Sequence, residues 1–373
     1  MPGIAIVDSG IVYRNPMPHL RSRHAYFPTV VELESGELLV GMDIGTAFEA
    51  VDVRSCVCRS ADGGKSWSQP QQLFEPDESQ HPVSTSCRIG KLQDGSLIGW
   101  AALFDRSRTE VGLANTETEG FCRTENFTIR SLDGGHNWSA PQRVELPADW
   151  REFEICAPPF QVNEQSLLVV TRPFFDWEGK VSPWGQDGMA FRSDNCGESW
   201  SEFIRVFGGS EDQLSANEQA IARLTDGRLI CLCWTIDHRT DKSLANRIAF
   251  SEDDGRTFTG QQATPLQGET SRPLALEGNR LLVVYRRTDK KGFWAQLAQL
   301  DGEHWTPLAD QLLWGGEVTS HRTNIDSKLG QMSTLKFGCP AIQRLQDGDA
   351  FVVFWCVEDC VSVIRWFRLQ VEG

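Results

Sequence analysis

The 373-residue chain carries 36 Lys and Arg against 51 Asp and Glu, a formal net charge of −15. This negative field excludes nucleic acid as a default partner. The balance of 40% hydrophobic and 23% charged residues is typical of a soluble globular protein. No apolar run approaches the roughly 18 residues of a membrane helix, so no membrane association is expected.

The start of the chain lacks the basic and long apolar segments of a secretion signal. The 11 Cys form an odd number, and none of them shows the paired spacing of a zinc site. These features predict a cytoplasmic protein that holds no metal and no cofactor.

Strand-like segments recur along the whole chain. Residues 3–13 form the first, and six apolar hairpins follow. Their turns are centred, in chain order, on Gly36, Gly95, Gln165, Gly227, Asn279 and Gly348. Apolar runs bounded by Gly and Asp turns are typical of strands joined by tight turns. Six copies in 373 residues leave about 62 residues for each unit.

A second motif, S-x-D-x-G-x-x-W, alternates with these hairpins. Copies begin at Ser60, Ser131, Ser193 and Ser251. The third has Asn195 in place of Asp, and the last has Phe258 in place of Trp. The Asp side chain accepts hydrogen bonds from turn amides, and Gly allows a positive φ angle. Two hairpins in each unit make four strands. The sequence therefore predicts an all-β, six-bladed β-propeller as a single domain over 1–373, with residues 3–13 completing the last blade.

Successive strands in a blade are antiparallel, so both kinds of turn lie at one end of the propeller. The opposite end, called the top here, receives the long loops. These loops cover residues 42–54, 104–123, 172–188, 235–246 and 313–338. Long variable loops on a regular scaffold commonly carry the functional site. We therefore expect a pocket at the top of the central channel.

The six blades and the S-x-D-x-G-x-x-W repeats, known as Asp boxes, resemble the sialidase (neuraminidase) superfamily over essentially the whole chain. The segment Asn217-Glu218-Gln-Ala-Ile, followed by Asp226-Gly227, is similar to a family motif. The resemblance implies that Glu218 matches the Glu that assists the family's Tyr nucleophile. It also implies that Glu49, with Asp52 nearby, matches the acid/base Asp.

Other family positions hold different residues. The three Arg that bind the substrate carboxylate in sialidases correspond to Tyr26, Trp234 and a position near Lys290. No Tyr follows Tyr285, so the late loop lacks the nucleophile. One Lys does not replace three guanidinium forks. These departures predict a substrate other than sialic acid.

The residues support a site on their own. Glu218 lies nine positions before its turn centre (227−218), and Arg88 and Arg272 lie seven before theirs (95−88 and 279−272). The shared parity predicts one strand face for all three. A carboxylate between two Arg is expected to have a lowered pKa. Glu49, among apolar loop neighbours, is expected to have a raised pKa that suits a general acid.

The leading hypothesis is a glycoside hydrolase acting on an acidic, non-sialic sugar. Its catalytic candidates are Glu218, Glu49 and Asp52, and its substrate-binding candidates are Arg88, Arg272, Tyr26, His24 and Trp234. A non-catalytic sugar- or protein-binding propeller is the alternative. A true exo-sialidase and a uronic-acid lyase are further alternatives. The sugar, the anomeric outcome and the oligomeric state stay open.

Overall fold

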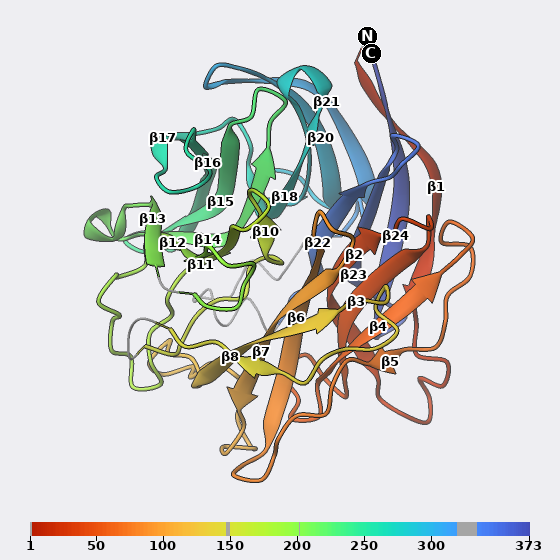
Figure 1. Ribbon diagram of the computed structural model, residues 1–373, viewed down its shortest axis with the longest axis vertical. Coiled ribbons are helices and arrows are strands. Elements are labelled where there is room, and N and C mark those ends of the chain that lie inside the picture. Colours follow the sequence, from red (N-terminus) through yellow and green to blue (C-terminus); the bar gives the residue numbers. More distant parts are fainter. Residues whose placement is uncertain (1, 147–149, 201, 319–333) are drawn as a thin grey trace.

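Six four-stranded antiparallel sheets surround a central axis in the computed structural model, and the two chain ends lie close together (Figure 1). The structure describes residues 2–146, 150–200, 202–318 and 334–373. It thus confirms the predicted all-β, six-bladed propeller. Within the described residues, no helix is long and apolar enough to cross a membrane.

In blades one to three, the strands run outward from the centre in chain order. Blade one holds β2 (His24–Glu32), β3 (Leu38–Gly45), β4 (Arg54–Ser60) and β5 (Gln71–Gln72). Blade two holds β6 (Val83–Lys91), β7 (Leu97–Asp105), β8 (Thr124–Ser131) and β9 (Gln142–Arg143). Blade three holds β10 (Phe160–Gln161), β11 (Leu167–Thr171), β12 (Gly188–Ser193) and β13 (Glu202–Phe207).

Blades four and five repeat this order, whereas the last blade borrows its outer strand from the chain start. Blade four holds β14 (Leu214–Arg223), β15 (Leu229–Asp237), β16 (Lys242–Ser251) and β17 (Thr259–Ala263). Blade five holds β18 (Gly268–Leu276), β19 (Arg280–Arg287), β20 (Phe293–Asp301) and β21 (His304–Trp314). Blade six holds β22 (Phe337–Arg344), β23 (Ala350–Glu358), β24 (Val361–Glu372) and β1 (Gly3–Tyr13). The pairing of β1 with β24 closes the ring as predicted.

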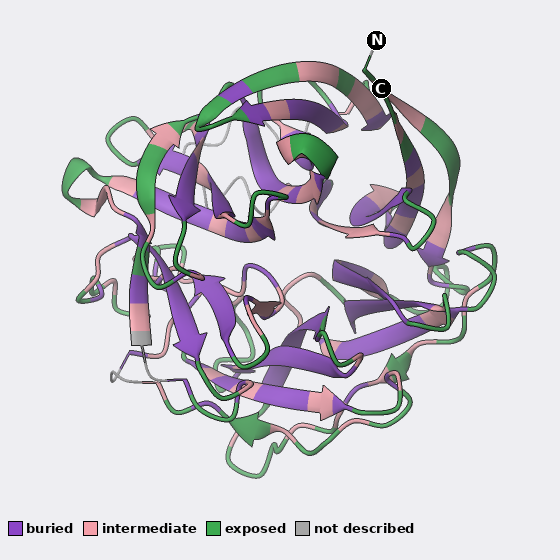
Figure 2. Cartoon of the chain, turned by 45° about the horizontal axis from the view of Figure 1, so that its top comes forward, coloured by how far each residue is buried: buried purple, intermediate pink, exposed green. Residues whose placement is uncertain are grey.

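The core lies between the blades, where the middle strands of each sheet are buried and the outer strands are exposed (Figure 2). All residues of β3 and β11 are buried. Between blades two and three, the Trp100 ring stacks on Phe191 at 5.7 Å and meets Trp200 edge-on at 4.9 Å. Aromatic pairs in such arrangements add about 0.5–1.5 kcal/mol each beyond their buried area. The blades are therefore held together mainly by buried apolar contact.

The repeated turns are closed by their own side chains. In the first copy, the amide of Gly64 donates to Ser60 Oγ at 2.8 Å, and the amide of Ser66 donates to Asp62 Oδ1 at 2.9 Å. The indole N–H of Trp67 donates to the Gly64 carbonyl at 2.9 Å. The Ser, Asp, Gly and Trp of the motif are thus used within the turn, which supports a structural role.

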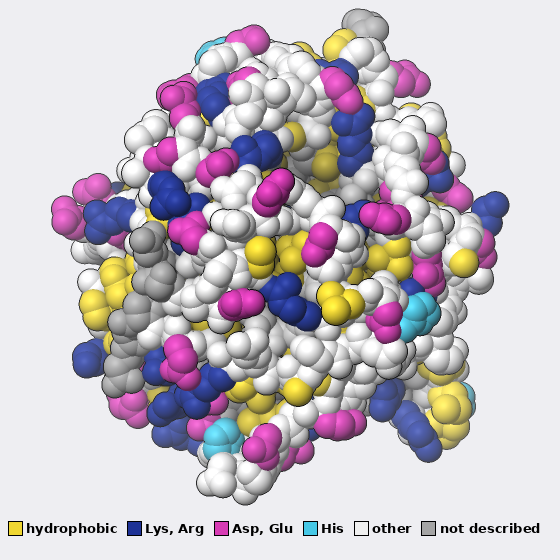
Figure 3. All heavy atoms as spheres, in the orientation of Figure 1, with side chains coloured by type: hydrophobic (Ala, Val, Ile, Leu, Met, Phe, Trp, Pro, Cys, Tyr) yellow, Lys and Arg dark blue, Asp and Glu magenta, His cyan; other side chains and the backbone are white. Residues whose placement is uncertain are grey.

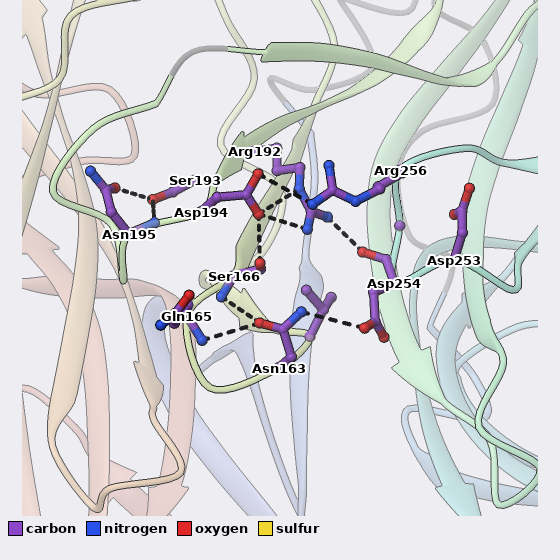
Figure 4. Close-up of polar contacts among 12 residues, drawn as sticks. Asn163, Gln165, Ser166, Arg192, Ser193, Asp194, Asn195, Asp253, Asp254 and Arg256 are labelled. Atoms are coloured by element: carbon purple, nitrogen blue, oxygen red, sulfur yellow. Dashed lines mark hydrogen bonds and ion pairs between the residues drawn. The ribbon is translucent and has the colours of Figure 1, made fainter.

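An arginine contact links consecutive blades near these turns. An Arg stands immediately before the Ser of each of the first three repeats. Its side chain donates to a backbone carbonyl of the next repeat, at the fourth position of the S-x-D-x-G-x-x-W motif. The pairs are Arg59–Gly134, Arg130–Cys196 and Arg192–Asp254. Figure 4 shows the third pair, in which Asp194 also accepts from the Arg192 Nε at 2.9 Å. In blade four, Phe250 stands before the repeat in place of the Arg. The guanidinium of Arg228 lies over the Phe250 ring and donates to the Gly302 carbonyl at 2.9 Å.

Candidate functional site

A cavity of about 670 Å³ occupies the central channel and reaches the top loops. The first strands of the blades supply most of its wall, and loop residues such as Phe48 and Glu49 supply the rest. On the face seen in Figure 3, hydrophobic side chains gather near the middle, with charged side chains around them. Five of the eight candidates line the cavity, namely Glu218, Glu49, Arg88, Arg272 and Tyr26.

Four of the first strands are bulged at the same point. The register of β2, β14, β18 and β22 shifts where two residues have no partner on the next strand. The first unpaired residue has a positive φ in every case, at Phe27 (51°), Glu218 (48°), Thr270 (54°) and Cys339 (45°). A non-glycine residue in this conformation is strained, and such residues often cluster at functional sites.

The bulge changes how Glu218 reaches the cavity. Strict alternation predicts one strand face for Glu218, Arg88 and Arg272, but the pairing of β14 shifts between Asn217 and Ala220. Consecutive residues of a first strand also line the cavity, because the free edge of each first strand faces the channel. The alternation of side chains along the strands therefore does not by itself explain why Glu218, Arg88 and Arg272 line the same cavity.

Glu218 is held through its backbone, and its carboxyl group remains available. Its N–H donates to Glu154 Oε2 at 2.9 Å, and its carbonyl accepts from Arg272 Nη1 at 2.9 Å. The Glu218 Oε2 atom is buried and has no hydrogen-bond partner among the described residues. Burial raises the pKa of Glu218 to about 7, with Arg286 opposing the rise and Glu154 adding to it. The expected lowering of this pKa is wrong, because Arg272 binds the carbonyl and burial outweighs the guanidinium charges.

Glu49 is enclosed by the loop that follows β7. The amide of Leu113 donates to Glu49 Oε2 at 2.9 Å, and Arg106 donates to the Glu49 carbonyl at 2.9 Å. Burial raises the pKa of Glu49, as the apolar loop sequence predicts, while the Leu113 amide and the Arg106 charge oppose the rise. Asp52 is exposed and outside the cavity wall, where its Oδ1 accepts from the amide and hydroxyl of Thr46 at 3.0 and 2.9 Å.

The two arginines differ in their partners. Arg88 makes a buried ion pair of 3.3 Å with Asp43 and lies over the Phe27 ring at 5.0 Å. Arg272 donates to the Glu218 carbonyl and, at 2.6 Å, to that of Cys156. Among the described residues, no carboxylate lies within 4.0 Å of the Arg272 guanidinium. Its charge is therefore balanced less directly than that of Arg88.

Of the remaining candidates, Tyr26 lines the cavity, whereas His24 and Trp234 do not. Tyr26 is buried and packs edge-on against Phe48 and Trp355 at 4.9 and 5.4 Å. His24 lies outside the cavity wall and accepts from the Ser362 amide at 3.0 Å, and burial lowers its pKa. Trp234 also lies outside the wall, and its indole N–H donates to Ser243 Oγ at 3.0 Å.

Sequence reasoning missed Cys339, a residue of blade six that lines the cavity. Its thiol donates to Glu218 Oε1, and the sulfur–oxygen distance is 3.6 Å. A signal for it exists. Counted from the hairpin turns, Phe27, Glu218, Thr270 and Cys339 all lie nine positions before the centre (36−27, 227−218, 279−270 and 348−339). Applying the Glu218 offset to every blade would have identified this residue.

No protein-family model and no curated protein matches the sequence. Solved structures do match it in fold. A protein of unknown function from Dyadobacter fermentans is 19% identical with a TM-score of 0.72, and each chain is covered over 100%. The NanB sialidase of Streptococcus pneumoniae (K499G mutant) is 12% identical with a TM-score of 0.66, over 96% of this chain and 70% of that one.

A sialidase from Trypanosoma rangeli, solved in complex with sialic acid, is 14% identical with a TM-score of 0.63. The match covers 92% of this chain and 54% of that one. Identities this low establish the fold and leave the activity to the site. The chain has the six-bladed β-propeller fold of the sialidases.

Proposed function

We propose that this protein is a carbohydrate-active enzyme, a glycoside hydrolase that acts on an acidic sugar other than sialic acid. The observation that carries the proposal is the Glu218 carboxyl, which lines the cavity with one buried oxygen lacking a partner among the described residues. A buried polar group without a partner costs free energy. Binding of a sugar hydroxyl or proton transfer to a substrate gives this oxygen a function.

Two carboxyl groups with raised pKa values suit acid/base chemistry near neutral pH. In the proposed reaction, Glu49 gives a proton to the leaving oxygen, because its burial favours the protonated form. Glu218 takes a proton from the attacking group, because a pKa of about 7 leaves it partly ionised at neutral pH. Glycosidases divide the work between two carboxyl groups in this way.

The acidic group of the sugar is assigned to the arginine side of the cavity. Arg272 has no carboxylate within 4.0 Å among the described residues, so its charge is available to a bound anion. Arg88 contributes less, since Asp43 already balances it. Tyr26 shapes the apolar wall. Asp52, His24 and Trp234 lie outside this wall, and the proposal gives them no contact with the reacting sugar.

The assay compares wild type with Glu218→Gln on aryl uronides, neutral aryl glycosides and an aryl sialoside. We expect release of the aryl group from a uronide and a loss of at least about 10²-fold in the variant. Preferred turnover of the sialoside would overturn the substrate assignment. An unsaturated uronate product, detected by its ultraviolet absorbance, would indicate elimination instead of hydrolysis.

A non-catalytic sugar-binding propeller is the second candidate, and the apolar wall favours it. Phe27, Phe48 and Tyr26 form a cluster of aromatic rings in the cavity wall, and such rings also suit sugar binding without chemistry. Calorimetric titration with the same glycosides separates the two functions. Binding without turnover in the wild type, unchanged in Glu218→Gln, would favour the binding module.

A further inference from the structure

We infer that Cys339 and Glu218 form a nucleophile–base pair, in which Cys339 Sγ attacks an electrophilic carbon held in the cavity while Glu218 takes the thiol proton. The covalent role in glycoside hydrolysis rests on the proposed function. The pairing itself rests on the geometry of two side chains from the first strands of blades four and six.

The first support is position. Cys339 and Glu218 occupy equivalent bulges of β22 and β14, and both are held in the left-handed backbone region. Both line the cavity, and the thiol donates to Glu218 Oε1 at 3.6 Å. A nucleophile with a base within hydrogen-bonding reach is the arrangement that activates a thiol.

The second support is the free oxygen on the base. Oε2 of Glu218 is buried without a partner among the described residues, so the carboxyl has capacity beyond the thiol contact. Burial, followed by the charge of Glu218, raises the pKa of Cys339 to about 12, while Arg286, Arg272 and Arg88 oppose the rise. The resting thiol is therefore protonated. It needs a base during attack, and three guanidinium groups stabilise the sulfur charge that develops.

A second thiol shows why Cys339 is the assigned nucleophile. Cys156 Sγ contacts Glu154 Oε2 at 3.1 Å, but the Cys156 side chain is buried. The same Glu154 oxygen also accepts from the Glu218 amide. Cys339 is partly exposed, and its carboxyl partner is less occupied. Cys156 therefore serves as a matched internal control.

The bond changes balance without an added oxidant or reductant. As Sγ bonds to the anomeric carbon, the thiol proton moves to Glu218 and the glycosidic carbon–oxygen bond breaks. The leaving oxygen takes a proton from Glu49. Water then attacks the anomeric carbon and passes a proton to the now anionic Glu49. The carbon–sulfur bond breaks, and the sulfur regains the proton from Glu218.

Iodoacetamide tests the pair without any sugar, because its carbon accepts sulfur with loss of iodide. Alkylation rates at each Cys are followed by peptide mass spectrometry between pH 6 and 9 in wild type and Glu218→Gln. We expect the rate at Cys339 to be at least tenfold lower in the variant, and the rate at the exposed Cys360 to be equal in both. Equal rates at Cys339, or no label there while Cys360 is labelled, would overturn the inference.

Folding is controlled within the same experiment. Label on Cys231, which is buried and outside the cavity wall, would report unfolding of the variant. In that case the wild-type pH profile decides. A rate at Cys339 that levels off above pH 7, as Glu218 completes its ionisation, supports the pair. A rate that keeps rising tenfold per pH unit, as for an unassisted thiol, refutes it.

Turnover gives the second measurement. If the wild type cleaves an aryl uronide, Cys339→Ala should lose at least 10²-fold in kcat with its melting temperature preserved. Full activity in that variant would eliminate the nucleophile role, even if alkylation depends on Glu218. If the wild type cleaves no aryl glycoside, the proposed function fails, and alkylation still decides whether the thiol and the carboxyl act together.

Discussion

Arg272 Nη1 donates a hydrogen bond of 2.9 Å to the main-chain carbonyl of Glu218, and this contact joins the first strands of blades five and four at the cavity wall. The same guanidinium reaches the Cys156 carbonyl of blade three. One side chain thus positions the backbone of three blades while leaving its charge beside the cavity. Its substitution should affect both structure and binding.

Arg272→Lys tests this double role. Lys keeps the charge but does not span two carbonyls with a planar fork. We expect KM for an aryl uronide to rise at least tenfold, with a smaller change in kcat, and the melting temperature to fall by a few degrees. Initial-rate kinetics and calorimetry measure the two effects. Arg280→Lys, at a half-buried position of blade five outside the cavity wall, is the control, and equal effects in both variants would contradict the assignment.

The pKa of Glu218 predicts a pH-dependent stability. Its folded value of about 7 exceeds its ordinary value of 4.5, so the folded state holds a proton that the unfolded state releases between these pH values. Stability from this group is complete below about pH 4.5 and falls as pH rises to about 7. This rise in pKa corresponds to about 3 kcal/mol.

Glu218→Gln should remove the loss of folding stability that Glu218 causes as the pH rises. Urea unfolding at pH 4.5, 6 and 7.5 should show the variant gaining stability over wild type as pH increases. Glu117→Gln, at an exposed loop position, should show no such trend. A constant difference between Glu218→Gln and wild type across this range would mean that Glu218 titrates near its ordinary value.

Glu49→Gln should reduce turnover by about 10²-fold or more, because a proton donor to the leaving oxygen is lost. The alkaline limb of the kcat/KM profile should disappear, since loss of the Glu49 proton no longer limits the rate. Asp52→Asn is the neighbouring control and should keep turnover within about twofold. A profile in which the alkaline limb follows Asp52→Asn would transfer the acid role to that residue.

The arginine contact between repeated turns should stabilise the fold without affecting the site. Arg192 is 1% exposed and donates to the Asp254 carbonyl at 2.6 Å (Figure 4). Hydrogen bonds of charged groups contribute about 1.5–3 kcal/mol, so Arg192→Met should lower the free energy of unfolding by about that amount. Arg256→Met, at a mostly exposed position, is the control. Both variants should keep wild-type turnover, and a selective loss in Arg192→Met would place the site near these turns.

The sequence by itself determined the propeller, because the hairpins and turns of each blade are formed by residues that are close together in the chain. Gly36 and Gly227 mark tight turns within single hairpins. In each of the four repeats, the Ser hydroxyl and the Asp or Asn side chain accept hydrogen bonds from amides of the same turn. Such patterns depend on neighbours along the chain, so they can be read without the fold. The raised pKa of Glu49 was predicted from its apolar loop neighbours, but the burial that causes it also involves the loop that follows β7, more than 50 positions along the chain.

Only the tertiary structure decided how the central groups interact. Arg272 meets the carbonyl of Glu218 instead of its carboxylate because a bulge turns the β14 backbone, so burial sets the pKa. Cys339 reaches Glu218 across 121 positions of the chain. Closure of the ring brings such groups together, and burial and contact across a ring depend on all six blades at once, which local patterns do not encode.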